Sequence, residues 1–441
     1  GVTGPMKANE ELKIKLLKFR TDKRAYYSML ALAIAFLITL PAELICNVRP
    51  LLLVVEGKPY FPILFAYSEK DFGGTLPSEP DYKSGDFLKL LNGGTVPGES
   101  RSQKDRTAND EEVEENILHL EMSDFEEEDV EEAEFSIGLE DFEEEESLSP
   151  TKQVQIPPPP GAGSQAASEP KEYWMIWPPV RYDYQYIPTE SKTGRVVLAA
   201  PYETPSADRT RTIPSSWQDG HYLGTDDRGR DVLARLIYGF RVSMIFGLSL
   251  AITGTLLGCL LGGIQGFFGG WVDLIGQRLT EIWGSIPRLY ILIILSAFLV
   301  PSPILLFAIL NLTAWMGIAA YIRAEFLKTR NLEYVKAARA LGVSDFKIMR
   351  KHILPNSLTP VITFFPFEVT AGILALVSLD YLNLGIPSPA PSIGELLAQG
   401  KNNLQARWIL LPTFVMLTTS LTLLTFIGDG IRNAFDPRKS V

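Results

Sequence analysis

Six stretches of this chain carry almost only apolar side chains over lengths that approach the thickness of a lipid bilayer. They cover residues 26–46, 242–264, 279–300, 304–322, 361–382 and 409–427. A helix needs roughly 20 apolar residues to cross a hydrocarbon layer of about 30 Å, where every backbone polar group has to be paired within the protein. We therefore predict an all-α membrane protein with six transmembrane helices. The third helix has to extend back past Pro287 to Leu279, because the uninterrupted apolar run there is short.

Lysine and arginine residues in the short flanking segments predict the orientation of these helices, since such residues stay on the cytoplasmic side. Both the tail before the first span, residues 1–25, and the connection between the fourth and fifth spans, residues 323–358, are rich in them. The connection between the third and fourth spans has none. We therefore expect both termini in the cytoplasm. The first span does not end in a small-residue cleavage site, so it is expected to be a retained anchor.

The segment between the first and second spans, residues 47–222, is then external. Its centre is acidic, because residues 110–146 contain 20 carboxylates and no lysine or arginine. The whole chain has a formal charge of −11, so the rest of the chain is basic. Such charge density repels itself and cannot bury a core, and it predicts disorder over residues 105–165. A docking strip for a partner or for cations is the alternative. Residues 51–65 alternate enough to predict strands. The aromatic stretch 173–186 fits either the bilayer surface or a packed loop.

Cysteine and histidine provide no candidate metal site or disulfide framework. The two cysteines, Cys46 and Cys259, lie in apolar runs, and the three histidines are scattered without ligand spacing. In the second span, Gly254, Gly258 and Gly262 recur at every fourth position, a pattern that lets a neighbouring helix approach closely. These glycines predict that the span packs against protein.

A polar segment interrupts the apolar runs between the fourth and fifth spans. Asn331 is a candidate N-cap of a first helix over residues 332–341, and Gly342 is able to take the positive φ that ends it. Ser344 caps a second helix, which is expected to run to Leu354 and stop at Pro355. The segment thus predicts two short basic helices in the cytoplasm.

The first of these helices has one face almost free of side-chain bulk, formed by Ala337, Ala338 and Gly342. Three larger residues, Tyr334, Leu341 and Phe346, provide anchors beside it. A small, smooth helix flanked by basic residues fits a groove in another protein. Its charge equally permits a helix lying on anionic lipid. The shape alone leaves both interpretations open.

The residues of this segment resemble a known family. KAARALG (336–342) followed by Leu354 and Pro355 looks like the EAA motif in a cytoplasmic loop of permease subunits of bacterial ABC importers, with Ala337, Ala338 and Gly342 at matching positions. Lys336 stands where the general pattern has Glu, and His352 stands where it usually has Ile. No family role is therefore carried over to those two positions.

Further motifs extend the resemblance over residues 223–441. LGTDDRGRDVLARLIYGFRVS (223–243), LGIPSPAPSIGELL (384–397) and GDGIRNAFDPR (428–438) are similar to C-type subunits of oligopeptide and dipeptide permeases. RAEFLKTRN (323–331), GELLAQGKNNLQARW (394–408) and the long external segment most resemble the Yej-type E subunit of microcin C and peptide importers. The acidic block lies outside the pattern.

The resemblance implies a multi-pass protein of the bacterial inner membrane with the type I importer permease fold, whose residues 223–441 form the permease domain with five helices. In such permeases the cytoplasmic loop, here residues 323–358, forms a coupling helix that is seated in a cleft of an ATPase subunit. The contact with the ATPase would be made by Tyr334, Ala337, Ala338, Leu341, Gly342, Leu354 and Pro355. Implied partners are a homologous permease forming a heterodimer, two ABC ATPase subunits, a periplasmic solute-binding protein, a peptide substrate and membrane lipid, with no nucleic acid. ATP and Mg would bind to the ATPases, because this chain lacks a GxxxxGK[ST] phosphate loop and is not expected to be an enzyme. A permease for nickel or another small solute, or a channel or scaffold subunit without an ATPase, is the alternative.

Overall fold

The structure is a computed structural model that describes residues 8–92, 171–189, 191–205, 211–298 and 302–435. The chain divides into two compact units. The first contains residues 1–53, 61–65 and 175–441, and the second contains residues 54–60 and 66–174. The predicted disorder over residues 105–165 lies outside the described residues.

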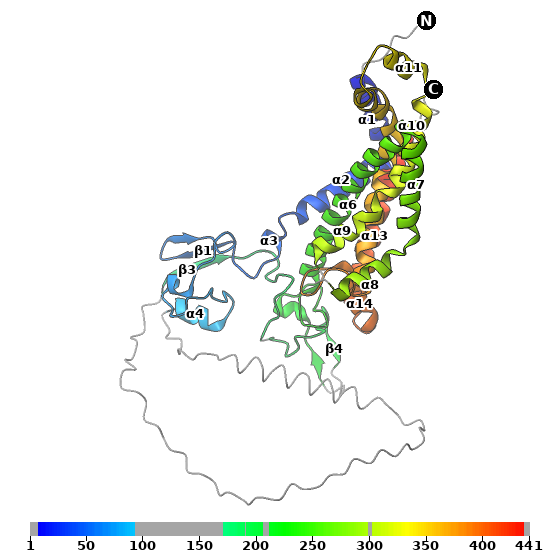
Figure 1. Cartoon of the computed structure of the whole chain (residues 1–441). Helices are drawn as coiled ribbons and strands as arrows, with labels where there is room; N and C mark the ends of the chain where they lie inside the picture. The colour runs from blue at the N-terminus through cyan, green and yellow to red at the C-terminus, as the bar shows by residue number, and fades with distance from the viewer. Residues whose placement is uncertain (1–7, 93–170, 190, 206–210, 299–301, 436–441) are drawn as a thin grey trace, which may run out of the picture. The chain divides into compact units, whose positions relative to one another are not determined.

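The first unit is helical (Figure 1). Its helices are α1 (Ala8–Thr21), α2 (Lys23–Thr39), α3 (Ala42–Ile45), α6 (Val232–Phe268), α7 (Gly270–Ser285), α8 (Arg288–Phe298), α9 (Pro303–Ala314), α10 (Met316–Thr329), α11 (Glu333–Ala340), α12 (Asp345–Ile348), α13 (Leu354–Tyr381), α14 (Ile393–Asn402) and α15 (Arg407–Phe435). Among the described residues, four helical stretches are long and apolar enough to cross a membrane: Val232–Phe268 (α6), Pro303–Thr329 (α9 with α10), Asp345–Tyr381 (α12 to α13) and Arg407–Phe435 (α15). They correspond to four of the six predicted spans.

The other two predicted spans are not single helices. Residues 26–46 contain most of α2, which has 17 residues and begins at Lys23, then a turn at Leu40 and Pro41 and the short α3. Residues 279–300 include the break between α7 and α8, where Pro287 lies just before α8. Proline has no N–H to donate and a ring that clashes with the preceding turn, so it separates the two helices here.

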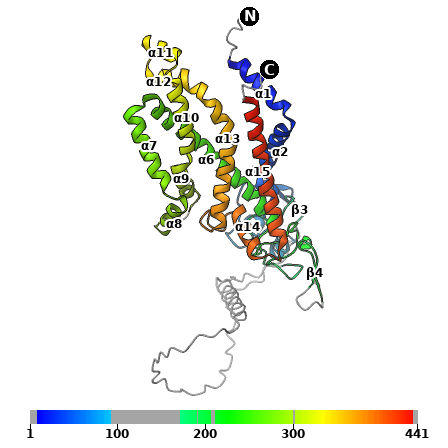
Figure 2. The same cartoon turned by 90° about the vertical axis from the view of Figure 1, so that its right-hand side faces the viewer.

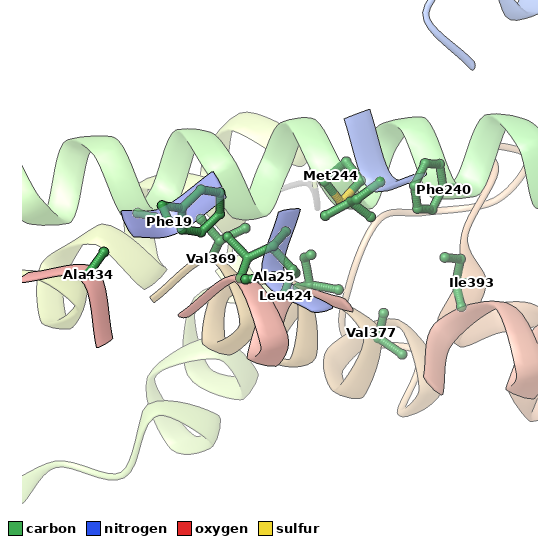
Figure 3. Close-up of a cluster of buried hydrophobic side chains, with 13 residues drawn as sticks. Phe19, Ala25, Phe240, Met244, Val369, Val377, Ile393, Leu424 and Ala434 are labelled. Atoms are coloured by element: carbon green, nitrogen blue, oxygen red, sulfur yellow. The ribbon is translucent and has the colours of Figure 1, made fainter. Parts of the chain in front are cut away.

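A core of buried side chains joins α1, α2, α6, α13, α14 and α15 (Figure 3). Helix α6 is central, because α10 and α13 both pack along it, while α15 packs against α2 and α13. The labelled members of this core are Phe19, Ala25, Phe240, Met244, Val369, Val377, Ile393, Leu424 and Ala434. The amino-terminal helices are therefore an integral part of the bundle.

The predicted stop at Pro355 is wrong. Helix α12 continues through a π-helical turn, Met349–Ile353, directly into α13, and Pro355 lies in the first turn of α13. The N–H of Leu354 donates to the carbonyl of Met349, five residues back. Pro355 has no N–H to donate to the preceding turn, and the π-helical turn directly before it, with its wider hydrogen-bond spacing, carries the helix past this point without ending.

Residues 47–222 contain small sheets, so the all-α description does not extend to this segment. Strands β1 (Leu52–Val55), β2 (Lys58–Tyr60) and β3 (Tyr173–Ile176) form a sheet in the order β2–β1–β3, and β4 (Thr204–Pro205) pairs with β5 (Thr212–Ile213). The strands expected within residues 51–65 are confirmed up to Tyr60. The second unit also contains the 3-10 helix Glu69–Phe72 and α4 (Gly85–Leu91), with the rings of Phe72, Tyr82 and Phe87 in mutual contact.

The aromatic stretch 173–186 forms packed contacts in the first unit. Tyr182 is buried, stacks on His221 at 3.9 Å between ring centroids, and donates its hydroxyl to the carbonyl of Asp219 at 2.6 Å. The ring of Tyr184 lies 4.8 Å from that of Tyr238 on α6. Trp174, in contrast, is 51% exposed. The packed-loop interpretation therefore holds for Tyr182 and Tyr184.

Candidate functional site

The polar segment between α10 and α13 is a compact helix pair at one end of the bundle, and α14 lies at the opposite end (Figures 1 and 2). Helix α11 ends in a left-handed turn: Gly342 has φ +77°, its N–H donates to Arg339 at 3.0 Å, and the N–H of Val343 donates to Ala338 at 3.2 Å. These two hydrogen bonds satisfy carbonyls that a helix end leaves without partners. The predicted role of Gly342 in ending the helix is confirmed.

The predicted start of this helix is wrong by one residue. Leu332, with extended backbone, is the N-cap of α11, and no side chain caps it. The side-chain amide of Asn331 instead donates to the carbonyl of Leu327 at 3.1 Å. Ser344 is the N-cap of α12, as predicted, although its hydroxyl makes no capping bond.

Four side chains hold the pair together from inside: Val335, Ala338, Ile348 and Ile353 are buried in one cluster. Ala338 thus contributes to the interior of the pair rather than to its outer surface. On the rim, the Tyr334 hydroxyl lies 3.4 Å from the carbonyl of His352. Leu354 is half-buried beside the same cluster.

The outer surface of the pair is apolar at two projecting positions. Leu341 is 84% exposed and Phe346 is 73% exposed. Ala337, Gly342 and Pro355 are also exposed, and Tyr334 is 42% exposed. Beside Phe346 lies a depression of about 460 Å³ lined by Lys347, Arg350, Lys351 and Pro355. Large exposed apolar side chains rimmed by polar groups are typical of protein contact surfaces.

The glycine repeat of α6 positions α10, which leads into this helix pair. A Cβ added to Gly258 would lie 2.8 Å from the Trp315 carbonyl oxygen and from the Ile318 Cβ, and one on Gly262 would lie 2.3 Å from the Ala319 oxygen. At Gly254 the nearest atom, the Cβ of Ala314, would be 3.1 Å away. The backbones of α6 and α10 therefore approach too closely for larger residues.

Two arginines, Arg323 and Arg330, connect this region to the start of α7 and the end of α6. The guanidinium of Arg323 forms a bidentate pair with Asp273, one bond of which measures 2.7 Å. Arg330 donates to the carbonyls of Gly266 and Phe267 at 3.3 and 3.2 Å. Gly269, with φ +63°, leaves room for that guanidinium, because a Cβ there would lie 2.2 Å from it. A bidentate arginine fixes geometry as well as charge.

The opposite end of the bundle contains a buried ion network. Arg230 pairs with Asp226 at 2.8 Å and with Glu395 at 3.0 Å, and Arg235 pairs with Glu395 at 2.5 Å. Asp226 and Arg235 are 0% exposed and Arg230 is 2% exposed. Removing one partner of a buried pair leaves an uncompensated charge, at a typical cost of about 3–5 kcal/mol. The network therefore fastens α14 to the start of α6.

Neighbouring polar contacts extend the network. Ser392 caps α14 by accepting from the N–H of Glu395 at 3.2 Å, and its hydroxyl donates to Asp380 at 2.6 Å. Burial raises the pKa of the Glu395 carboxyl, but the guanidinium groups of Arg235 and Arg230 outweigh it and hold the pKa below its ordinary value of 4.5. For Asp227, burial and the neighbouring Asp226 charge raise the pKa above its ordinary value. Glu395 is thus stabilised in its charged form.

No local pattern in the sequence predicts a role for these charged residues. The charged stretch TDDRGRD lies directly before an apolar run, but its partner Glu395 is 165 residues away from Arg230. Within the described residues, no group of three or more His, Cys, Asp or Glu side chains is placed to hold a metal ion.

Comparison with known proteins adds a family match and several relatives. Residues 254–441 match the family model described as "Binding-protein-dependent transport system inner membrane component". The chain is 38% identical over 432 residues to the peptidoglycan transport system permease protein YejE of Agrobacterium fabrum, covering 96% of this chain and 92% of that protein. It is 35% identical to the inner membrane ABC transporter permease protein YejE of Escherichia coli, covering 96% of both.

A more distant relative matches only the later part of the chain. The dipeptide transport system permease protein DppC of Bacillus subtilis is 35% identical over 223 residues, which are 49% of this chain and 69% of that protein. The chain therefore belongs to the family of binding-protein-dependent ABC importer permeases, in the branch that contains the YejE proteins.

Proposed function

We propose that this chain is the permease subunit of an ABC importer for peptides and forms half of the translocation pathway. The observation that carries this proposal is the match along 96% of the chain to two YejE proteins, one of which is named for peptidoglycan transport. Relatives of the permease domain are named for dipeptide and oligopeptide transport. Peptidoglycan, dipeptides and oligopeptides all contain peptide bonds, so we take a peptide as the substrate.

In the proposed topology, α2 with α3 forms the first membrane span and α7 with α8 forms the third, which gives six spans with the four longer helices. Helices α1 and α11 and the carboxyl end of α15 lie at the same end of the bundle (Figures 1 and 2). All three regions carry basic residues. By the positive-inside rule this end is cytoplasmic, and residues 47–222 are periplasmic.

The helix pair α11–α12 is the proposed ATPase contact. Leu341 and Phe346 would enter a cleft of the ATPase, while Tyr334, Ala337, Gly342 and Pro355 would form the surface around them. Ala338 and Leu354 would contribute indirectly, because they pack in the interior of the pair and hold its two helices together. The exposure of Leu341 and Phe346 supports this assignment, because such side chains gain from burial against a partner.

The complete importer would contain a homologous permease, two ATPase subunits and a periplasmic solute-binding protein. The ATPases would bind ATP and Mg, and their closure would move the two coupling helix pairs. That movement requires the ATPases to bind the two permease conformations with different affinities. In this scheme the buried network at α14 keeps the periplasmic end of the permease rigid.

The proposal is tested by purifying the chain with its partner subunits and measuring ATP-dependent peptide uptake into proteoliposomes. The double variant Leu341→Ser, Phe346→Ser should lose co-purifying ATPase and reduce uptake by roughly tenfold or more, as expected for central contact residues. The matched control is Leu64→Ser, Phe65→Ser, which removes another exposed leucine and phenylalanine (71% and 60% exposed) elsewhere. Solute conductance without nucleotide would instead support a channel, and normal uptake in the double variant would contradict the assigned contact.

A further inference from the structure

A cavity of about 650 Å³ lies where α14 meets α15, at the same end as the buried ion network. One wall comes from residues 195–205, which end at β4, and the other comes from residues 401–408. This volume lies within the range of roughly 300–1,000 Å³ that is usual for sites that bind small molecules. The cavity is separate from the helix pair proposed to contact the ATPase, which is at the other end of the bundle (Figure 2).

The charge of the cavity lining is positive. Arg195 and Lys401 line it, and none of its described lining residues is acidic. The Nε of Arg195 donates to the carbonyl of Val197 at 3.1 Å, which orients the guanidinium, and the Lys401 ammonium lies 5.7 Å from the centre of the Tyr381 ring. Neither cation forms an ion pair with any residue that the structure describes. Both are therefore available to an anionic ligand.

Two aromatic rings also line the cavity. The rings of Tyr202 and Trp408 meet edge to face, 5.8 Å apart at 85°. The indole N–H of Trp408 donates to the carbonyl of Thr225 at 3.1 Å, so the ring is held in place. Gly224, with φ +76°, makes this possible, because a Cβ there would lie 2.7 Å from the Trp408 Cδ1. The Trp408 ring is thus a fixed part of the site.

The other polar groups of the lining are the hydroxyl of Thr204 and three amide side chains, of which that of Asn403 donates to the carbonyl of Gln399 at 3.0 Å. The amides of Asn402 and Gln405 lie in the cavity wall and have no hydrogen-bond partner in the described part of the chain. Amides both donate and accept, which suits the N–H and carbonyl groups of a peptide. The site therefore has cations that can pair with the carboxylate of a peptide, amides that can bond to its backbone, and aromatic rings that can pack against an apolar side chain.

We propose that this cavity binds a short peptide through its terminal carboxylate, which would pair with Arg195 and Lys401. The choice of a peptide rests on the proposed function, whereas the requirement for an anion follows from the lining itself. A ligand bound here would bridge residues 195–205 to the α14–α15 connection. Because Glu395 on α14 is fastened to α6 by the buried network, occupancy would act directly on the outer ends of three helices.

The test is isothermal titration of the full chain in lipid nanodiscs with tri-alanine and with tri-alanine amide, which lacks the carboxylate. Tri-alanine should bind, and the amide should bind roughly tenfold more weakly, as expected for the loss of a charge-assisted hydrogen bond. The double variant Arg195→Gln, Lys401→Gln should lower the affinity for tri-alanine by a similar factor and remove the preference over the amide.

The matched control is Lys192→Gln, Arg407→Gln. It removes the same charge from one residue just before the first wall segment and one within the second, but neither residue lines the cavity. Unchanged affinity in the control supports the site. Equal binding of acid and amide, equally tight binding of inorganic phosphate, or an equal loss in the control would overturn the proposal. A reconstituted importer that still takes up peptide after such a result would leave the proposed function intact, so the two failures are distinguishable.

Discussion

The guanidinium of Arg235 donates to the carboxylate of Glu395 at 2.5 Å, although the two residues are 160 positions apart in the chain. Arg235 is fully buried on α6, and Glu395 lies in the first turn of α14. Arg230 and Asp226 close the network around them. In this chain α14 is therefore fastened to the beginning of α6 by charge rather than by apolar contact alone.

Replacing Glu395 by Gln should destabilise the fold. Arg230 and Arg235 would remain buried while their pairing charge is lost, which typically costs about 3–5 kcal/mol. Thermal unfolding of the purified protein in detergent measures the effect. Asp345→Asn is the matched control, because it removes a carboxylate from an exposed pair with Arg339 at 3.6 Å, where little contribution is expected. Equal midpoints for the two variants would contradict the role of the network.

The same carboxylate predicts a pH dependence. Its folded-state pKa is lowered, so its contribution to stability is fully present above the unfolded-state value and is lost as the pH falls through the lowered folded-state pKa. The difference in unfolding midpoint between wild type and Glu395→Gln should therefore shrink as the pH drops below 4.5. A difference that grows under acid conditions would reverse the assigned sign.

Local patterns in the sequence predicted the features that depend on local geometry. The spacing of Gly254, Gly258 and Gly262 predicted close helix packing, and the structure places α10 against them. Gly342 was expected to adopt positive φ, and it does. In both cases the absence of a Cβ is itself the physical requirement, so the residue type is sufficient to predict the backbone.

Features that depend on distant residues could not be predicted in this way. Nothing near Arg235 in the sequence identifies Glu395 as its partner. The π-helical turn Met349–Ile353 carries the chain past Pro355 into α13, whereas propensity alone predicts a stop there. Likewise, Ala337 and Ala338 are adjacent residues of the same type. Only the packing of α11 on α12 buries Ala338 and leaves Ala337 exposed.

The contact between α6 and α10 predicts a steric effect at Gly262. Gly262→Leu would force side-chain atoms into the Ala319 backbone, and overpacking of this kind typically costs about 1–3 kcal/mol or more. Expression level and thermal midpoint in detergent should both fall. Gly317→Leu on α10 is the control, since a Cβ there meets no atom within 4 Å. Loss of stability in the control but not in Gly262→Leu would contradict the close packing.

The left-handed turn at Gly342 provides the last prediction. A Cβ at this position meets open space within 4 Å, so a substitution acts through the backbone conformation and not through a clash. Gly342→Val should cost about 1–2 kcal/mol in this turn, because a side chain disfavours positive φ, whereas Gly342→Asn should be tolerated since asparagine visits this region more readily. In the reconstituted importer, peptide uptake should fall several-fold for the valine variant while membrane insertion, measured by protease protection, stays normal. If the asparagine variant fails equally, or if both transport normally, the shape of this turn does not govern coupling to the ATPase.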